Sequence, residues 1–149
     1  MNQHPYLRAY MAGISVPTPL LLAALTVFSF ARFVYNVPIP VERVIIFPMA
    51  IIPNLFGVWN MLHLASRSST HLPLGIHGAL LPFILAPAGF VLGRALGFLE
   101  LTGHTLIYFG IVHIHFVHIA AVFPAVLIVY YLVWKYLIGF FNKVEGIAE

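Results

Sequence analysis

Long stretches without charge constrain this chain more than any other feature. No Asp, Glu, Lys or Arg occurs in the 23 residues between Arg8 and Arg32, and a second uncharged run covers residues 44–66. A helix needs roughly 20 apolar residues to cross the hydrocarbon core of a bilayer. Hydrophobic residues make up 62% of the chain and charged residues 7%, whereas about a quarter of the residues in a soluble domain are charged. The sequence therefore predicts an integral membrane protein.

The spacing of these runs predicts an all-α, polytopic membrane protein with four transmembrane helices in a single domain, residues 1–149. The predicted spans are residues 13–33, 44–65, 78–98 and 105–138. The "VPTP" segment at 16–19 is placed near the start of the first span, where the missing N–H of proline is least harmful. Pro48 and Pro53 predict a bend in the second span, because each removes an intrahelical hydrogen bond.

The last uncharged run is too long for one simple span. It covers 34 residues from Leu101 to Trp134, which as one helix would reach about 50 Å against about 30 Å of hydrocarbon. We favour one long or kinked helix at 105–138. The alternative is an interfacial or re-entrant segment at 102–118, followed by a span at 119–138 with Pro124 at the joint.

Four spans place both termini on one side of the membrane. The basic residues expected on that side are Arg8, Arg67, Lys135 and Lys143, and those on the other side are Arg32, Arg43 and Arg94. This count favours cytoplasmic termini under the positive-inside rule. The same basic residues do not cluster, so no nucleic-acid partner is expected.

Catalysis is not expected from this composition. The chain has no Cys, which excludes disulfides, thiolate metal sites and thiol nucleophiles. It has no nucleotide-binding, serine-hydrolase or zinc-protease motif. Its four carboxylates belong to Glu42, Glu100, Glu145 and Glu149. So few acidic groups leave little basis for paired-carboxylate chemistry, and we predict that the protein is not an enzyme.

Three histidines, His113, His115 and His118, lie together in the apolar stretch "GIVHIHFVHIAA" at 110–121. An unpaired polar group in hydrocarbon costs several kcal/mol, so a ligand or a neighbouring helix should compensate. A tetrapyrrole is one candidate, because its metal takes imidazole in an apolar, aromatic slot. A transition metal shared by His115 and His118, at i and i+3, is another. With His104 added, these are the predicted cofactor-binding residues.

Arranged as a helix, the same region would carry a polar stripe. At 100° per residue, five side chains fall within an arc of about 80°. They are Glu100, His104, Tyr108, His115 and His118. Because imidazole titrates near neutral pH, such a stripe could relay protons. A second polar face is predicted on the second span, formed by Asn60, His63 and Arg67.

We expect a small non-catalytic subunit of a larger membrane complex, of an electron-transfer or photosynthetic type, that ligates a tetrapyrrole or metal through the histidines of the last helix. Its partners would be lipid and either other membrane subunits or further copies of itself. One alternative is a homo-oligomeric transporter or channel for a proton or metal ion that uses the polar stripe as its pore. The other is a ligand-free scaffold whose histidines make interhelical or interfacial hydrogen bonds.

Overall fold

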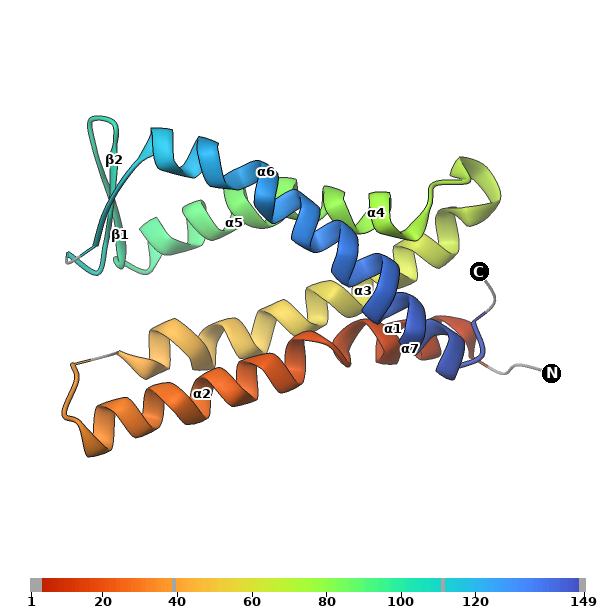
Figure 1. The fold of residues 1–149 in the computed structure, drawn as a ribbon, viewed down its shortest axis with the longest axis horizontal. Coiled ribbons are helices and arrows are strands. Elements are labelled where there is room, and N and C mark those ends of the chain that lie inside the picture. The colour runs from red at the N-terminus through yellow and green to blue at the C-terminus, as the bar shows by residue number, and fades with distance from the viewer. Residues whose placement is uncertain (1–3, 39, 111, 148–149) are drawn as a thin grey trace. The chain divides into compact units, whose positions relative to one another are not determined.

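The structure, a computed structural model, describes residues 4–38, 40–110 and 112–147. The elements follow in the order α1 (Pro5–Ile14), α2 (Pro17–Val34), η1 (Glu42–Ile46), α3 (Phe47–Thr70), α4 (Leu74–Leu80), α5 (Pro82–Ala95), β1 (Leu99–Thr102), β2 (Thr105–Tyr108), β3 (Val112–His115), α6 (Phe116–Leu132), η2 (Val133–Ile138) and α7 (Gly139–Val144) (Figure 1). The segments η1 and η2 are short π-helices. The chain divides into two compact units. The first unit comprises the described residues up to Leu72 and those from Lys135 onward, and the second is Pro73–Trp134.

Four helical stretches are long and apolar enough to cross a membrane, which confirms that part of the prediction. They are Pro5–Val34, Glu42–Thr70, Leu74–Ala95 and Phe116–Val144. The first stretch begins earlier than expected, because α1 precedes the prolines and a turn at Ser15 and Val16 separates it from α2. Pro17 is the first residue of α2, where its missing N–H leaves no intrahelical hydrogen bond unmade.

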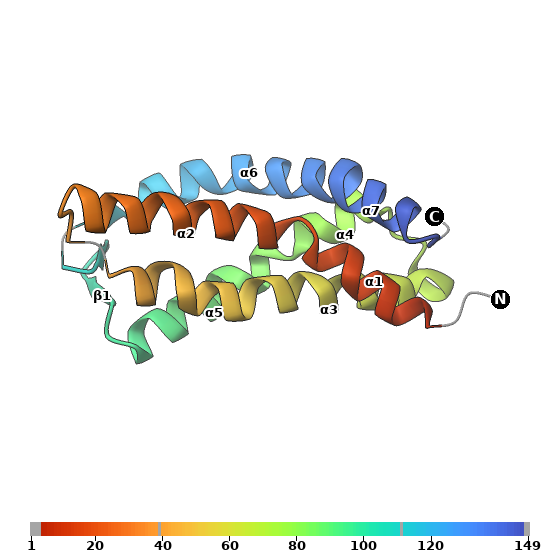
Figure 2. The ribbon, with the colours of Figure 1, turned by 90° about the horizontal axis from the view of Figure 1, so that it is seen from below.

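Close backbone contact between α1 and α3 organises the first unit. Helix α3 runs back alongside α2 and α1 (Figure 2), and α1 makes its most extensive contacts with α3. A Cβ added to Gly13 would lie 2.6 Å from the backbone oxygen of Phe56 and 2.7 Å from the Cα of Gly57. A Cβ on Gly57 would overlap the ring of Tyr10. Small residues at such crossings let helices approach closely. The close approach increases van der Waals packing, which contributes to the attraction between helices in lipid.

The two described ends of the chain meet in this first unit. Helix α7 contacts α1, and a Cβ on Gly146 would lie 3.3 Å from Nη1 of Arg8. Both ends therefore lie at the same end of the first unit (Figure 1). This arrangement agrees with an even number of membrane-length helices.

In the second unit, α4 and α5 pack against the part of the long C-terminal helix that ends at Trp134. A Cβ on Gly75 would lie 2.7 Å from Cε2 of Tyr131, and a Cβ on Gly78 would overlap the side chain of Trp134. Further along, the rings of Phe83 and Phe123 meet edge to face with centroids 5.2 Å apart. Glycine on α4 therefore opposes large aromatic side chains on α6 and η2.

The all-α prediction is wrong between α5 and α6. Here β1, β2 and β3 form an antiparallel sheet in the order β1-β2-β3. The helix predicted at 105–138 begins instead at Phe116 and continues to Val144. The alternative prediction, which left residues 102–118 out of the last span, agrees better with the structure. Most of this segment forms strands of the sheet. Gly103, with φ +58, supplies the positive φ that a two-residue hairpin loop takes at its first position.

Substitution of Gly13 tests the packing of α1 on α3. Gly13→Ala should destabilise the protein by about 1–3 kcal/mol, since the added methyl group meets rigid backbone. Gly89→Ala is the matched control, because a Cβ on Gly89 of α5 meets nothing within 4 Å. It should leave stability unchanged or raise it by up to about 1 kcal/mol through helix propensity. Reversible unfolding in mixed micelles measures both changes, and equal stability of the two variants would contradict this packing.

Candidate functional site

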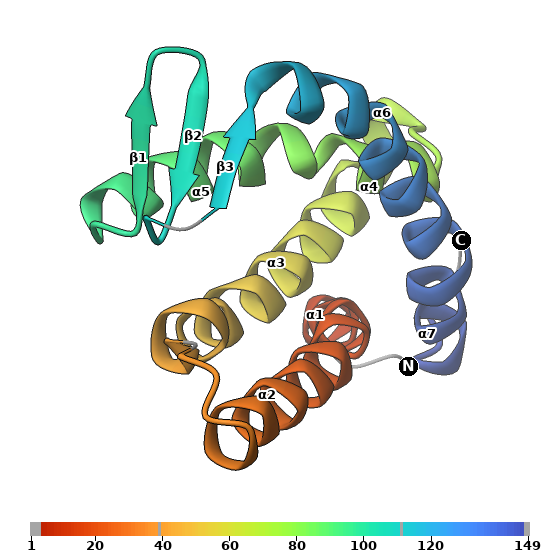
Figure 3. The same cartoon turned by 60° about the vertical axis from the view of Figure 1, so that its left-hand side comes forward.

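The three strands lie side by side in Figure 3, and the register of their pairing gives the sheet two chemically different faces. Its register aligns Glu100, Ile107 and His113 in one row across the strands and Thr102, Thr105 and His115 in a second row. Side chains two residues apart on a strand share a face, so these six residues form one face, here called the polar face. The opposite face, here called the apolar face, consists of Leu99, Leu101, Leu106, Tyr108, Val112 and Ile114.

Histidines gather at one side of the polar face. Thr105 Oγ1 and His115 Nδ1 lie 3.0 Å apart in a hydrogen bond between β2 and β3. His118 follows on the first turn of α6, and its ring centroid is 6.0 Å from that of His115. His113 is two residues before His115 on β3, and all three histidines are exposed. The structure thus brings His115 and His118 together on the solvent-accessible surface of the unit.

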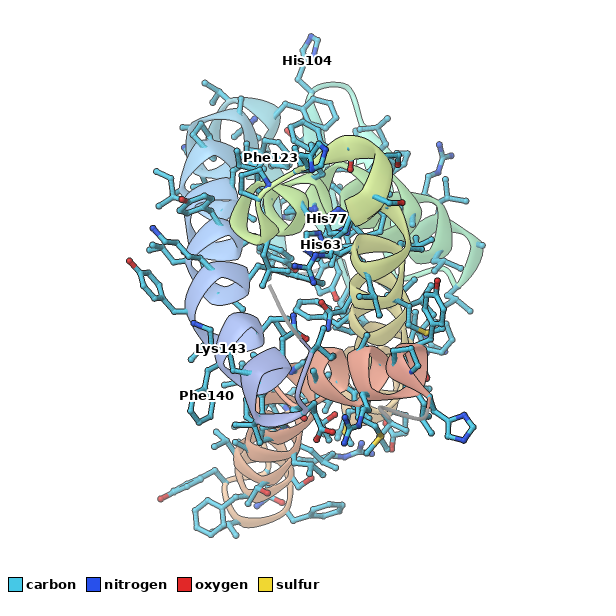
Figure 4. All side chains as sticks on the ribbon, turned by 90° about the vertical axis from the view of Figure 1, so that its right-hand side faces the viewer. His63, His77, His104, Phe123, Phe140 and Lys143 are labelled. Carbon is cyan, nitrogen blue, oxygen red and sulfur yellow. The ribbon has the colours of Figure 1, made fainter. Side chains whose placement is uncertain are left out.

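The predicted helical stripe is wrong, because successive residues of a strand point to opposite faces. Tyr108 lies on the apolar face, whereas Glu100 and His115 lie on the polar face. Glu100 and His113 are separated by Ile107, which puts them about 10 Å apart across two inter-strand spacings. His104 lies in the turn between β1 and β2 and projects away from the helices (Figure 4). The five residues therefore form no continuous line.

His115 and His118 form one pair of potential metal ligands. In the part of the chain that the structure describes, no three His, Asp or Glu side chains come together in a way that could hold a metal ion. His115 and His118 can supply two imidazole nitrogens, a donor type that zinc, copper and nickel accept. Water or a group from another chain would have to complete the coordination.

Three aromatic rings cluster at the end of the sheet near α5. The ring of Phe98 stacks on that of Phe109 at 5.3 Å and meets that of Tyr108 edge to face at 5.5 Å. Phe109 has a left-handed backbone, with φ 55, and its N–H donates to the oxygen of Phe98 at 2.8 Å. Partial burial raises the pKa of Tyr108 above its ordinary value of about 10. The phenol is therefore neutral at physiological pH.

The second predicted polar face lies on α3, and its first residue is structural. The Asn60 amide is buried and donates to the backbone oxygen of Ala9 at 2.8 Å and to Asn142 Oδ1 at 2.7 Å. Asn142, also buried, donates back to Asn60 Oδ1 at 3.3 Å. These bonds join α1, α3 and α7. His63 and Arg67 are half-buried further along α3.

Sequence reasoning missed several polar contacts. It did not single out Asn142, nor Tyr10, whose hydroxyl donates to Oδ1 of Asn54. It also gave no role to His77, which is buried on α4 with its ring centroid 6.0 Å from that of Trp134. The small residues Gly75 and Gly78 beside His77 were the available signal, because glycines near a polar residue mark close helix contacts.

Comparison of the chain with known protein families, with curated proteins and with solved structures finds no match.

The amide pair gives a second stability test. Asn60→Leu and Asn142→Leu should each destabilise the protein by about 1–3 kcal/mol, since each leaves the other buried amide without its partner. The double variant should lose less than the sum of the two, with a coupling of about 0.5–3 kcal/mol. Unfolding free energies from a double-mutant cycle measure this coupling. Strict additivity would show that the two amides act independently.

Proposed function

We propose that this protein is a small, non-catalytic integral membrane subunit that assembles with other membrane subunits or with copies of itself. The observation that supports this most directly is the exposure of its apolar helices. None of the residues of Phe116–Leu132, all of which the structure describes, is buried. A helix that is apolar all round belongs in a membrane or inside a larger protein. In the proposed assembly, lipid, other protein or both surround this helix.

The small interior supports a non-catalytic role. Among the described residues, only nine hydrophobic side chains other than proline are buried, and four of these are alanine or valine. Ligand sites in proteins are normally concave and enclose most of their ligand. Among the carboxylates, Glu42 forms an ion pair with Arg32 at 2.8 Å and Glu100 stands on the exposed polar face. Glu149 lies outside the described residues. The proposed contribution of this chain to a complex is therefore its apolar surface, which binds other subunits.

The open edges of the sheet determine where the histidines can reside. Strands β1 and β3 each pair on one side only. Lipid-exposed sheet edges do not occur in hydrocarbon, because each unpaired backbone group there costs several kcal/mol. The sheet and its histidines therefore belong outside the hydrocarbon core, in the headgroup region or in water. At this location the imidazole groups remain hydrated, so they do not require a buried ligand to compensate for the loss of water.

This location favours a metal ion over a tetrapyrrole as the ligand of His113, His115 and His118. A tetrapyrrole needs an apolar slot around its ring. His113 and His115 instead share an exposed face with Glu100 and threonine, and His118 is exposed on the first turn of α6. A hydrated divalent metal can bind at an exposed histidine pair with water as further ligands. The transporter alternative loses its main support, since the stripe that would line its pore is not continuous.

Assembly is tested by extracting the protein from its membrane in native lipid nanodiscs and weighing the particles by mass photometry or native mass spectrometry. The protein should be found with stoichiometric partner subunits or in more than one copy per particle. A particle that contains a single copy and no other protein would contradict the proposed role as a subunit.

Metal binding is tested by titrating the purified protein with Ni²⁺ or Zn²⁺ in a calorimeter. His115→Ala and His118→Ala should each weaken binding by about tenfold or more, since each removes one of two nearby imidazoles. His71→Ala is the matched control, because this exposed histidine ends α3 in the first unit, whereas His115 and His118 belong to the second. Equal affinity of all the variants would exclude the pair as the site. A Soret band in the absorption spectrum that depends on His115 would instead favour a tetrapyrrole.

A further inference from the structure

The apolar face of the sheet is too exposed to be explained by contacts within the chain. The exposed fractions of Leu101, Val112 and Ile114 are 41%, 48% and 38%. All three belong to the apolar face, whereas the polar face carries Glu100 and two histidines. One side of this small sheet thus needs an apolar environment, and the other needs water.

The helices hold the sheet at the end of two membrane-length segments. Only residues 96–98 separate α5 from β1, and α6 begins directly after His115. In Figures 1 and 3 the sheet lies across the ends of α5 and α6 that it connects. With no flexible linker on either side, the sheet must remain within a few ångströms of the point where these helices leave the hydrocarbon.

Contacts with α5 show which face is directed toward the helices. A Cβ on Gly93 of α5 would lie 3.0 Å from Cβ of Leu99 and 3.1 Å from Cε2 of Phe98. Leu99 belongs to the apolar face, and so does Tyr108, whose ring packs against Phe98. The apolar face is therefore turned toward the helices, and the polar face is turned away from them.

Aromatic side chains border the same region. Phe98, Tyr108 and Phe109 form the cluster at the end of the sheet near α5, and Phe116 at the start of α6 is 40% exposed. Tyrosine, with an apolar ring and a polar hydroxyl, is typical of the membrane interface, and the three phenylalanines add apolar surface beside Tyr108. Their position fits a sheet that rests at the level of the lipid headgroups.

We propose that the sheet lies flat on the bilayer, with its apolar face in the boundary between headgroups and acyl chains and its polar face in water. The partner of the apolar face is the lipid surface, and the histidines of the polar face remain accessible to solutes. The open edges of β1 and β3 are then satisfied by water and headgroups. This inference rests on the proposed membrane insertion of the helices, but not on assembly with partners or on metal binding.

The absence of native cysteine permits a direct test with single-cysteine variants carrying a small fluorophore. Leu101→Cys and Ile114→Cys report on the apolar face, and their neighbours Thr102→Cys and His113→Cys are the matched controls on the polar face. Val122→Cys, on an exposed position of α6, reports whether this helix is inserted at all. The full chain is reconstituted in phosphatidylcholine vesicles, and quenching by nitroxide-labelled lipids is compared with quenching by iodide present on both sides of the membrane.

The ratio of lipid quenching to iodide quenching should be several-fold higher at 101 and 114 than at 102 and 113, with 122 quenched by lipid alone. Equal ratios at neighbouring positions, or protection of 101 and 114 from both quenchers, would overturn the inference. Protection from both would point to a protein partner or a second copy on the apolar face. Iodide quenching at 122 would instead show that α6 is not inserted, which is a failure of the proposed function itself.

Discussion

Satisfaction of backbone hydrogen bonds is the constraint on which the rest of this structure depends. In hydrocarbon, N–H and C=O groups must be bonded within the chain, and an isolated helix meets this requirement without neighbours. The four apolar stretches are helical apart from the turn at Ser15 and Val16 and a one-residue turn at Leu81 between α4 and α5. The sheet at 99–115 leaves the edges of β1 and β3 unpaired. The change from helix to sheet after α5 therefore separates residues whose backbone groups are bonded within one helix from residues whose backbone bonding depends on neighbouring strands or on solvent.

Within each unit, very short contacts compensate for the small interior. Gly13 and Gly57 allow the backbones of α1 and α3 to touch, while Gly75 and Gly78 accept the rings of Tyr131 and Trp134. Burial of apolar surface drives little association between helices in lipid, so van der Waals packing and hydrogen bonds must supply it. In the first unit, the side-chain amides of Asn60 and Asn142 supply such hydrogen bonds by donating to each other.

The predicted polar stripe was wrong because residues 100–115 were assumed to have the period of a helix. Read at 100° per residue, Glu100, Tyr108 and His115 fall on one helix face. Read at 180°, "LELT", "TLIY" and "VHIH" each alternate, or nearly alternate, between apolar and polar or small residues. Gly103 and Gly110 mark the two turns between these segments. Short strands of this kind are recognised from an alternation of period two and from the glycines at their ends. Both signals are easily overlooked within a long uncharged run that is read as one helix.

The four membrane-length helical stretches follow from residue order alone, because hydropathy and charge act locally along the chain. The partners of polar residues do not follow from it. Asn60 and Asn142 are 82 positions apart, and their pairing depends on how α1, α3 and α7 pack. The pairing of β1, β2 and β3 likewise determines that His113 and His115 share a face with Glu100 while Tyr108 does not. Such pairings depend on contacts between separate segments, whose energies no local pattern contains.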